Sequence, residues 1–159
     1  MTKKLLMLKG LPASGKSTYA KELESQGWAR VNKDDIRKEF FPDYTFKNEK
    51  EVVYMEDSEI IAELREGNNV VVDNTHFNPK HQERLEKIAK EEGADFELLF
   101  IDTPLEECIK RNKKRPNSVP MEVILDMHRK YIAPLREKAI EYDENLEEAI
   151  IVDIDGTLA

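Results

Sequence analysis

Apolar residues occur along the chain as short continuous runs that are separated by amphipathic stretches. The runs cover residues 5–8, 29–32, 69–73, 96–101 and 149–154. Continuous aliphatic runs are typical of strands that are buried on both faces of a parallel sheet. The pattern therefore predicts five strands.

The stretches between these runs have apolar residues at helical spacing. Helices are predicted over 18–26, from 33 onward, over 51–66 and 78–92, from 105 into the run 110–115, over 121–131, and after Pro134 to about residue 142. Strands that alternate with helices predict an α/β fold. We expect a five-stranded, mainly parallel sheet with helices on both of its faces.

Two predicted helices have recognisable ends or faces. The 78–92 helix begins with Asn78-Pro79, an N-cap followed by proline at the first helical position. In the 51–66 helix one face is predicted to hold Val52, Met55, Glu59 and Ala62, with Val53, Ile60 and Leu64 close by. This assignment predicts which side of that helix packs on the sheet.

The segment after the first run has the pattern of a phosphate-binding loop. It reads Gly10-Leu11-Pro12-Ala13-Ser14-Gly15-Lys16-Ser17-Thr18 and matches G-x-x-x-x-G-K-[ST] between a predicted strand and a predicted helix. The glycines let backbone N–H groups approach phosphate oxygens closely. Lys16 supplies a positive charge for the β- and γ-phosphates of a nucleotide, and Ser17 supplies a hydroxyl for Mg²⁺. The loop therefore predicts nucleotide binding.

Charge and composition limit the classes of protein that fit. The 159 residues, of which 40% are hydrophobic, suit a single globular domain. A formal net charge of −8 is unlike that of a protein that coats long nucleic acid. The segment 110–115 nevertheless holds five basic residues in six positions. A local basic patch on an acidic body suits an enzyme that holds a few phosphates, although a solvated charge run is the alternative.

The sequence gives no sign of a membrane or a zinc site. No apolar run approaches the ~20 residues of a membrane span, and the run 5–8 is shorter than the ~7–15 residues of a secretory signal. The single Cys108 cannot form an internal disulfide. His76, His81 and His128 lack the spacing of zinc ligands. We therefore expect a cytoplasmic protein that does not bind membranes and needs no metal beyond nucleotide-bound Mg²⁺.

Candidate catalytic residues follow the predicted strands at their carboxyl ends, where ligands bind in such sheets. A phosphotransferase needs a carboxylate that accepts the proton of the acceptor hydroxyl and cations that stabilise the transferring phosphoryl group. Asp34 or Asp35, after the second strand, suits the first task. Arg111 and Arg115 suit the second task, on a segment that can close over ATP as a lid. Arg37 shares a helical face with Asp34 and can bind an acceptor phosphate in bidentate fashion.

Other readings of these residues remain open. Asp34 and Asp35 also suit a helix N-terminus purely as favourable charges. Asp73 is either a group near Mg²⁺ in the active site or a cap at the end of its strand. The stretch 32–35 matches the guanine-reading pattern N-K-x-D, but no aspartate-x-x-glycine switch motif stands between it and the phosphate-binding loop. A GTPase is therefore not favoured.

Five stretches together resemble the kinase domain of phage-type 5′-polynucleotide kinases. They are Gly10 to Thr18, Asn32 to Arg37, Asp73-Asn74-Thr75, Lys110 to Arg115 and Val119-Pro120, and their order along nearly the whole chain is the same. The resemblance implies a P-loop kinase fold similar to that of nucleoside-monophosphate kinases, with a helical lid. It also implies ATP and Mg²⁺ as cofactors and the 5′-hydroxyl ends of DNA or RNA as substrates in nucleic-acid repair.

The resemblance also implies roles for single residues. Asp34 is similar to the general base, Arg37 and Thr75 to contacts of the acceptor's 3′-phosphate with Asn74 beside them, and Arg115 with Arg111 to lid arginines on the donor phosphates. Lys33 stands where the phage relatives have arginine, so it can contact the nucleic-acid backbone without bidentate geometry. His76 stands where the family often has asparagine and is expected to have no catalytic role.

The last residues resemble the start of a second enzyme. The stretch 151–159 carries the D-x-D-G-T signature of haloacid-dehalogenase-type phosphatases, which follow the kinase domain in the phage enzymes. We expect a kinase domain over 1–148, followed over 149–159 by the last strand and a truncated phosphatase motif without phosphatase activity. In this reading Asp153 and Asp155 are structural, and a longer natural chain would carry the phosphatase domain.

Two further functions compete with end phosphorylation of nucleic acid. One is a P-loop kinase that acts on a small-molecule hydroxyl, which has similar chemistry. The other is a module that binds a nucleotide without catalysis. The pairing of Asp34 and Arg37 with the 73–75 stretch, together with the phosphatase-like end, favours the polynucleotide kinase.

Overall fold

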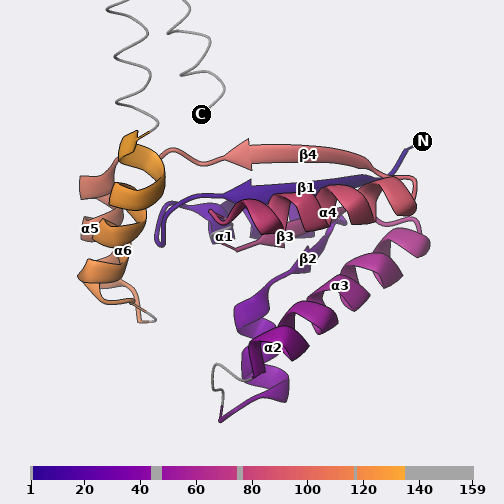
Figure 1. Cartoon of the computed structure of the whole chain (residues 1–159), viewed down its shortest axis with the longest axis horizontal. Coiled ribbons are helices and arrows are strands. Elements are labelled where there is room, and N and C mark those ends of the chain that lie inside the picture. The colour runs from indigo at the N-terminus through magenta and orange to yellow at the C-terminus, as the bar shows by residue number, and fades with distance from the viewer. Residues whose placement is uncertain (1, 44–47, 75–76, 117, 135–159) are drawn as a thin grey trace, which may run out of the picture. The chain divides into compact units, whose positions relative to one another are not determined.

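The computed structural model describes residues 2–43, 48–74, 77–116 and 118–134 (Figure 1). The chain divides into two compact units. The first consists of Met1–Lys9 with Lys16–Leu99, and the second of Gly10–Gly15 with Phe100–Ala159. The predicted strand 149–154, the predicted helix near residue 142 and the predicted domain boundary at residue 148 lie outside the described residues.

A parallel sheet forms the centre of the first unit. Its strands are β1 (Lys4–Lys9), β2 (Ala29–Val31), β3 (Val70–Asp73) and β4 (Asp95–Phe100), in the order β2-β3-β1-β4. Strand β3 pairs in parallel with both β1 and β2, and Figure 1 shows β1 and β4 pointing the same way. The α/β fold with a mainly parallel sheet is confirmed for the described residues, which contain four of the five predicted strands.

Helices pack on the sheet where β1 and β3 are apolar and buried on both faces. One face packs on α3 (Glu49–Arg65) and α4 (Pro79–Glu91) through a cluster that includes Leu5, Met7, Val31, Val70, Val72, Ile60, Leu64, Leu85 and Ile88. Alternation along a strand turns Leu6 and Leu8 to the opposite face, where they are also buried. Helix α1 (Lys16–Ser25) contacts β2 and β3 but contributes no residue to the cluster.

The buried face of α3 differs from the predicted one. The structure buries Val52, Glu56, Ile60 and Leu64, which follow one another at intervals of four residues. Glu59, which was predicted to lie on the inward face, is exposed. The prediction had Val52 on this face and Ile60 and Leu64 close to it, but it chose Glu59 instead of Glu56. Hydrophobic periodicity does not show which glutamate has a partner in the core.

Helix α2 (Lys33–Phe40) begins at an N-cap that also joins two strands. The Asn32 Oδ1 accepts a hydrogen bond of 3.1 Å from the backbone N of Asp35. The Asn32 Nδ2 donates a bond of 2.5 Å to the carbonyl oxygen of Asp73 at the end of β3. Because Asn32 has this capping role, β2 ends at Val31, one residue before the predicted end.

The second unit contains α5 (Leu105–Lys114), α6 (Met121–Met127) and a π-helical turn, η2 (His128–Ile132). The predicted 121–131 helix is therefore α-helical only in its first part. Asn112 is buried and closes the turn that follows α5. Its Oδ1 accepts a bond of 3.0 Å from Val119 N, and its Nδ2 donates one of 2.7 Å to Val119 O.

Candidate active site

One of the two glycines of the phosphate-binding pattern, Gly15, has a left-handed backbone. Gly15 has φ = 107°, a conformation that a side chain disfavours. Ala13 has φ = 64°, which is uncommon for a residue other than glycine and is typical of strained functional turns. The loop is closed by a hydrogen bond of 3.1 Å from Ser14 N to Leu11 O.

Ser14 forms polar contacts within the second unit through its backbone carbonyl. Its carbonyl oxygen accepts bonds from Thr103 Oγ1 at 2.6 Å and from Arg111 Nη1 at 3.4 Å. Its own hydroxyl is buried and has no hydrogen-bond partner among the described residues. A buried polar atom of this kind costs free energy unless a ligand or water satisfies it. The loop therefore fits a bound phosphate group.

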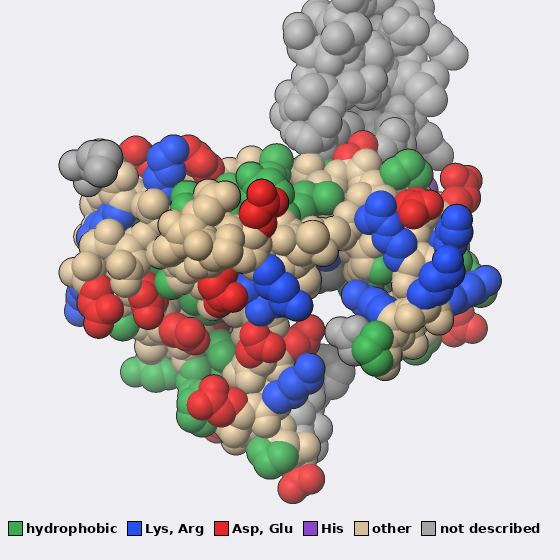
Figure 2. All heavy atoms as spheres, turned by 180° about the vertical axis from the view of Figure 1, so that it is seen from behind, with side chains coloured by type: hydrophobic (Ala, Val, Ile, Leu, Met, Phe, Trp, Pro, Cys, Tyr) green, Lys and Arg blue, Asp and Glu red, His purple; other side chains and the backbone are tan. Residues whose placement is uncertain are grey.

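The predicted lid arginines lie at the basic end of α5. Arg111 reaches the phosphate-binding loop and also forms an ion pair with Glu107 at 3.1 Å. Arg115 is the C-cap of α5, and its Nε donates a bond of 3.2 Å to Asn112 Oδ1. Figure 2 shows Lys and Arg side chains gathered over the part that α5 and α6 form. This patch has the charge that donor phosphates require.

The remaining residues of the loop pattern open α1 in the first unit. Lys16 is buried and Ser17 is exposed. An exposed hydroxyl after the lysine fits a ligand of nucleotide-bound Mg²⁺. The described residues contain no group of three or more His, Cys, Asp or Glu side chains that could hold a metal ion by themselves. Lys16 and Ser17 thus fit ATP with Mg²⁺.

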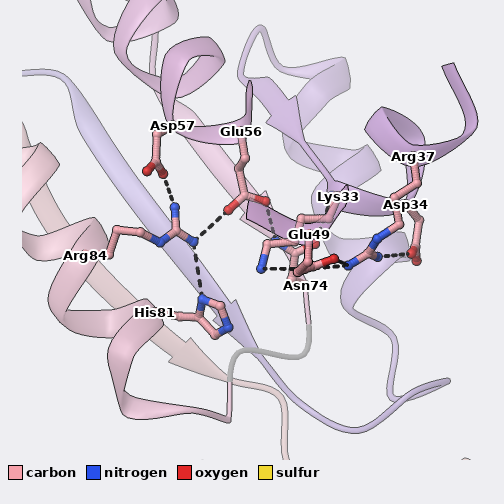
Figure 3. Close-up of polar contacts among 9 residues, drawn as sticks. All are labelled: Lys33, Asp34, Arg37, Glu49, Glu56, Asp57, Asn74, His81 and Arg84. Atoms are coloured by element: carbon pink, nitrogen blue, oxygen red, sulfur yellow. Dashed lines mark hydrogen bonds and ion pairs between the residues drawn. The ribbon is translucent and has the colours of Figure 1, made fainter. Parts of the chain in front are cut away.

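Asp34 and Arg37 form an exposed ion pair on the first turns of α2 (Figure 3). Arg37 Nη1 donates to Asp34 Oδ1 at 2.7 Å, and Nη2 donates to the Glu49 oxygens at 3.0 and 3.1 Å. The Asp34 side chain is 71% exposed, so solvent or a substrate can reach it. Burial lowers the pKa of Arg37, but the bonds to Glu49 and Asp34 outweigh this effect and leave that pKa raised.

Lys33 and Asn74 connect the start of α2 with the end of β3. The backbone N of Lys33 donates a bond of 3.1 Å to Asn74 Oδ1, which joins the start of α2 to the end of β3. The Lys33 side chain is buried, and its Nζ lies 3.9 Å from Glu49 Oε1. Desolvation by burial lowers the pKa of the Lys33 ammonium, although the nearby Glu56 and Glu49 raise it. The Lys33 ammonium therefore lies near carboxylates of α3 in a buried position.

Asp73 is buried and paired with one arginine. Its Oδ2 accepts bonds of 2.7 and 3.1 Å from Arg30, and only 2% of its side chain is exposed. The same guanidinium lies 3.3 Å from Asp35 Oδ2. Of the two readings left open for Asp73, this geometry favours the cap at the end of the strand.

The first unit thus brings together the predicted residues Lys33, Asp34, Arg37, Asp73 and Asn74. Thr75 and His76 lie outside the described residues. The second unit brings together the loop and Arg111. The roles of all these residues stay predictions.

Sequence reasoning did not find a polar cluster that joins α3 and α4. It consists of Glu49, Glu56, Asp57, His81 and Arg84, from helices α3 and α4 (Figure 3). Arg84 donates to Glu56 at 2.9 Å, contacts Asp57, and lies 3.3 Å from His81 Nδ1. The available signal was the position of Glu56, since it lies four residues from both Val52 and Ile60 on the buried stripe.

The fold and the phosphate-binding loop define the class of protein, a P-loop kinase. The profile of a family described as an AAA domain matches residues 5–134. The chain therefore belongs to this family. Among the described residues, no helix has the length and apolar character needed to cross a bilayer.

Three relatives show how the chain compares with known proteins. A putative bifunctional polynucleotide kinase/RNA ligase of Autographa californica nuclear polyhedrosis virus is 31% identical, over 99% of this chain and 25% of the viral protein. An L-seryl-tRNA(Sec) kinase of Methanococcus maripaludis is 32% identical, over 82% of this chain and 53% of that protein. A chain of the Pnkp1/Rnl/Hen1 RNA repair complex is 32% identical with a TM-score of 0.74, over 86% of this chain and 46% of that chain. The chain thus spans a quarter to about half the length of these relatives.

Proposed function

We propose that this kinase transfers the γ-phosphate of ATP to the 5′-hydroxyl end of DNA or RNA. The observation that carries the proposal is the Asp34–Arg37 pair, in which an exposed carboxylate is held at 2.7 Å by an arginine on the same helix. A carboxylate suits proton removal from a hydroxyl, and a guanidinium suits a phosphate of the same substrate. The names of the viral relative and of the RNA repair complex support this choice of acceptor.

On the donor side, the phosphate-binding loop and the lid arginines hold the nucleotide. Bound ATP–Mg²⁺ supplies the phosphoryl group and offsets part of its charge. We assign the β- and γ-phosphates to backbone N–H groups of the loop and to Lys16, and the magnesium ion to the Ser17 hydroxyl. Arg111 and Arg115 stabilise the negative charge that spreads over the transferring group.

On the acceptor side, Asp34 accepts the proton of the 5′-hydroxyl as the new bond forms. Arg37 binds the 3′-phosphate of the terminal nucleotide, with Asn74 and Thr75 beside it. A phosphate at this position competes with Glu49, which occupies the second arm of the guanidinium at 3.0 Å. Lys33 adds a positive charge toward the next phosphate, while Asp73 holds Arg30 and the strand end in place.

A second candidate acceptor is a hydroxyl that is not a nucleic-acid end. The 32% identity to an L-seryl-tRNA(Sec) kinase favours it, since the name of that relative points to the hydroxyl of a seryl group on a tRNA. A small-molecule hydroxyl would need the same general base and the same donor site. The two candidates differ in whether Arg37 is needed for an acceptor phosphate.

An acceptor panel separates these functions. The protein is incubated with γ-labelled ATP, Mg²⁺ and one acceptor at a time: a 5′-hydroxyl oligonucleotide, a seryl-tRNA, or a set of small alcohols. We expect label on the oligonucleotide. Label on the seryl-tRNA or an alcohol alone would reject end phosphorylation, and binding of ATP without transfer to any acceptor would indicate a non-catalytic module.

A cytoplasmic location and a phosphatase domain in a longer chain are further parts of this proposal.

A further inference from the structure

Glu56 is a buried carboxylate to which the proposed reaction assigns no task. It lies on α3 and is 0% exposed. A buried charge is unfavourable unless hydrogen bonds and an opposite charge compensate it. Both oxygens of Glu56 are bonded: Oε1 accepts from Arg84 Nη2 at 2.9 Å, and Oε2 accepts from Asn74 Nδ2 at 2.7 Å (Figure 3).

Asn74 transmits this constraint to the start of α2. Its Nδ2 donates to Glu56, and its Oδ1 accepts from the backbone N of Lys33 at 3.1 Å. A carboxylate only accepts hydrogen bonds, whereas an amide has one donating and one accepting end. The bond to Glu56 therefore determines which end of the Asn74 amide faces α2. Asp34 is the next residue of that helix.

We propose that Glu56 is a positioning residue for phosphoryl transfer. Its carboxylate orients Asn74, Asn74 holds the first turn of α2 through the Lys33 amide, and that turn places the Asp34 carboxylate. Arg84 supports this role by pairing with the second oxygen of Glu56. The proposal rests on the proposed function of Asp34 as the base.

Glu56→Gln tests the first step of this chain. The substitution leaves one accepting oxygen where Asn74 and Arg84 need two. We expect kcat to fall roughly ten- to hundredfold, because a small displacement of a reacting group has an effect of this size. The KM for ATP should stay unchanged. Glu59→Gln removes the same charge from the exposed side of α3 and should leave kcat unchanged.

A second substitution can restore the hydrogen bonds with their direction reversed. Asn74→Asp alone sets two carboxylates against each other and should also lower kcat. In the double variant, the new amide at position 56 donates to the new carboxylate at position 74 and still accepts from Arg84. The carboxylate at position 74 still accepts from the Lys33 amide. A carboxylate at position 74 also lies beside the proposed acceptor phosphate, so kcat is compared at saturating acceptor. There kcat should recover above that of both single variants, and a thermal melt shows which variants fold.

The outcomes decide between positioning and a merely structural role. The proposal is overturned if Glu56→Gln keeps the wild-type kcat, or if the double variant is no more active than the more active single variant. Should Glu56→Gln fail to fold, the comparison of the double variant with Asn74→Asp decides alone. Exchange of the Lys33 backbone amide, measured without substrate, should be faster in both single variants and slower again in the double variant.

This exchange measurement also separates the proposal from the proposed function. A wild-type protein that phosphorylates no nucleic acid would reject the function and leave the amide result standing. Unchanged Lys33 exchange in Glu56→Gln would reject the positioning role and leave the function standing.

Discussion

Asp34 combines exposure with a fixed orientation, which is what a general base needs. Its carboxylate is 71% exposed and lies 2.7 Å from the Arg37 guanidinium. We expect Asp34→Asn to lower phosphoryl transfer by roughly 10²-fold or more, because the amide cannot accept the proton. ATP binding, measured by calorimetry, should survive. A variant that keeps most of its activity would show that another group is the base.

Arg37 offers a second test on the same helix. Arg37→Ala should raise the KM for a 3′-phosphorylated acceptor about tenfold or more, since a charge-assisted pair is lost, and should leave the KM for ATP nearly unchanged. Arg65→Ala is a matched control, because Arg65 is exposed and forms an ion pair with Glu92. Equal losses for donor and acceptor would contradict the assigned role.

His81 should make the stability of the first unit depend on pH. Burial lowers the pKa of His81 below its usual value of 6.5, and the positive charge of Lys33 lowers it further. The carboxylates of Glu56 and Glu49 raise this pKa but do not outweigh the two lowering effects. Between the folded and unfolded pKa values the unfolded chain binds more protons, so the free energy of unfolding falls as the pH drops below 6.5. His81→Asn should flatten this dependence in urea titrations at several pH values. His128→Asn serves as the control, and an equal effect of the two substitutions would count against the account.

The start of α2 is the element on which the acceptor site depends. Asn32→Ala removes both the cap of Asp35 N and the bond to Asp73 O, whereas Asn78→Ala removes only the cap of Lys80 N on α4. We expect losses of about 2 and about 1 kcal/mol in the free energy of unfolding, respectively. Only Asn32→Ala should also lower transfer. Similar activity losses would mean that α2 needs no special support.

Elements with continuous apolar runs could be predicted closely from the sequence. Strands β1 and β4 and helix α4 differ from their predicted bounds by one residue at each end, although of the two strands only β1 is buried along most of its length. The loop and the Asp34–Arg37 pair could also be predicted, since both are local in sequence. The cluster around Glu56 could not, because its partner Arg84 lies 28 residues away on another helix.

The whole molecule carries a net charge of −8, with a local cluster of basic residues at the end of α5. It should therefore hold only a few phosphates of a nucleic acid. We expect the slope of log K against log salt for a short single strand to lie near −1.4 to −2.8, as roughly two to four phosphate contacts imply. Fluorescence anisotropy at several salt concentrations measures this slope. A slope near −5 or steeper would instead indicate a protein that coats nucleic acid.

The most direct test of the central claim compares two oligonucleotides that differ only at their 5′ ends. Each is incubated with the protein, γ-labelled ATP and Mg²⁺, and the label on the strand is counted. We predict label on the 5′-hydroxyl strand and none on the 5′-phosphorylated strand. Label on neither strand, from protein that binds ATP, would contradict end phosphorylation and leave a P-loop kinase with another acceptor.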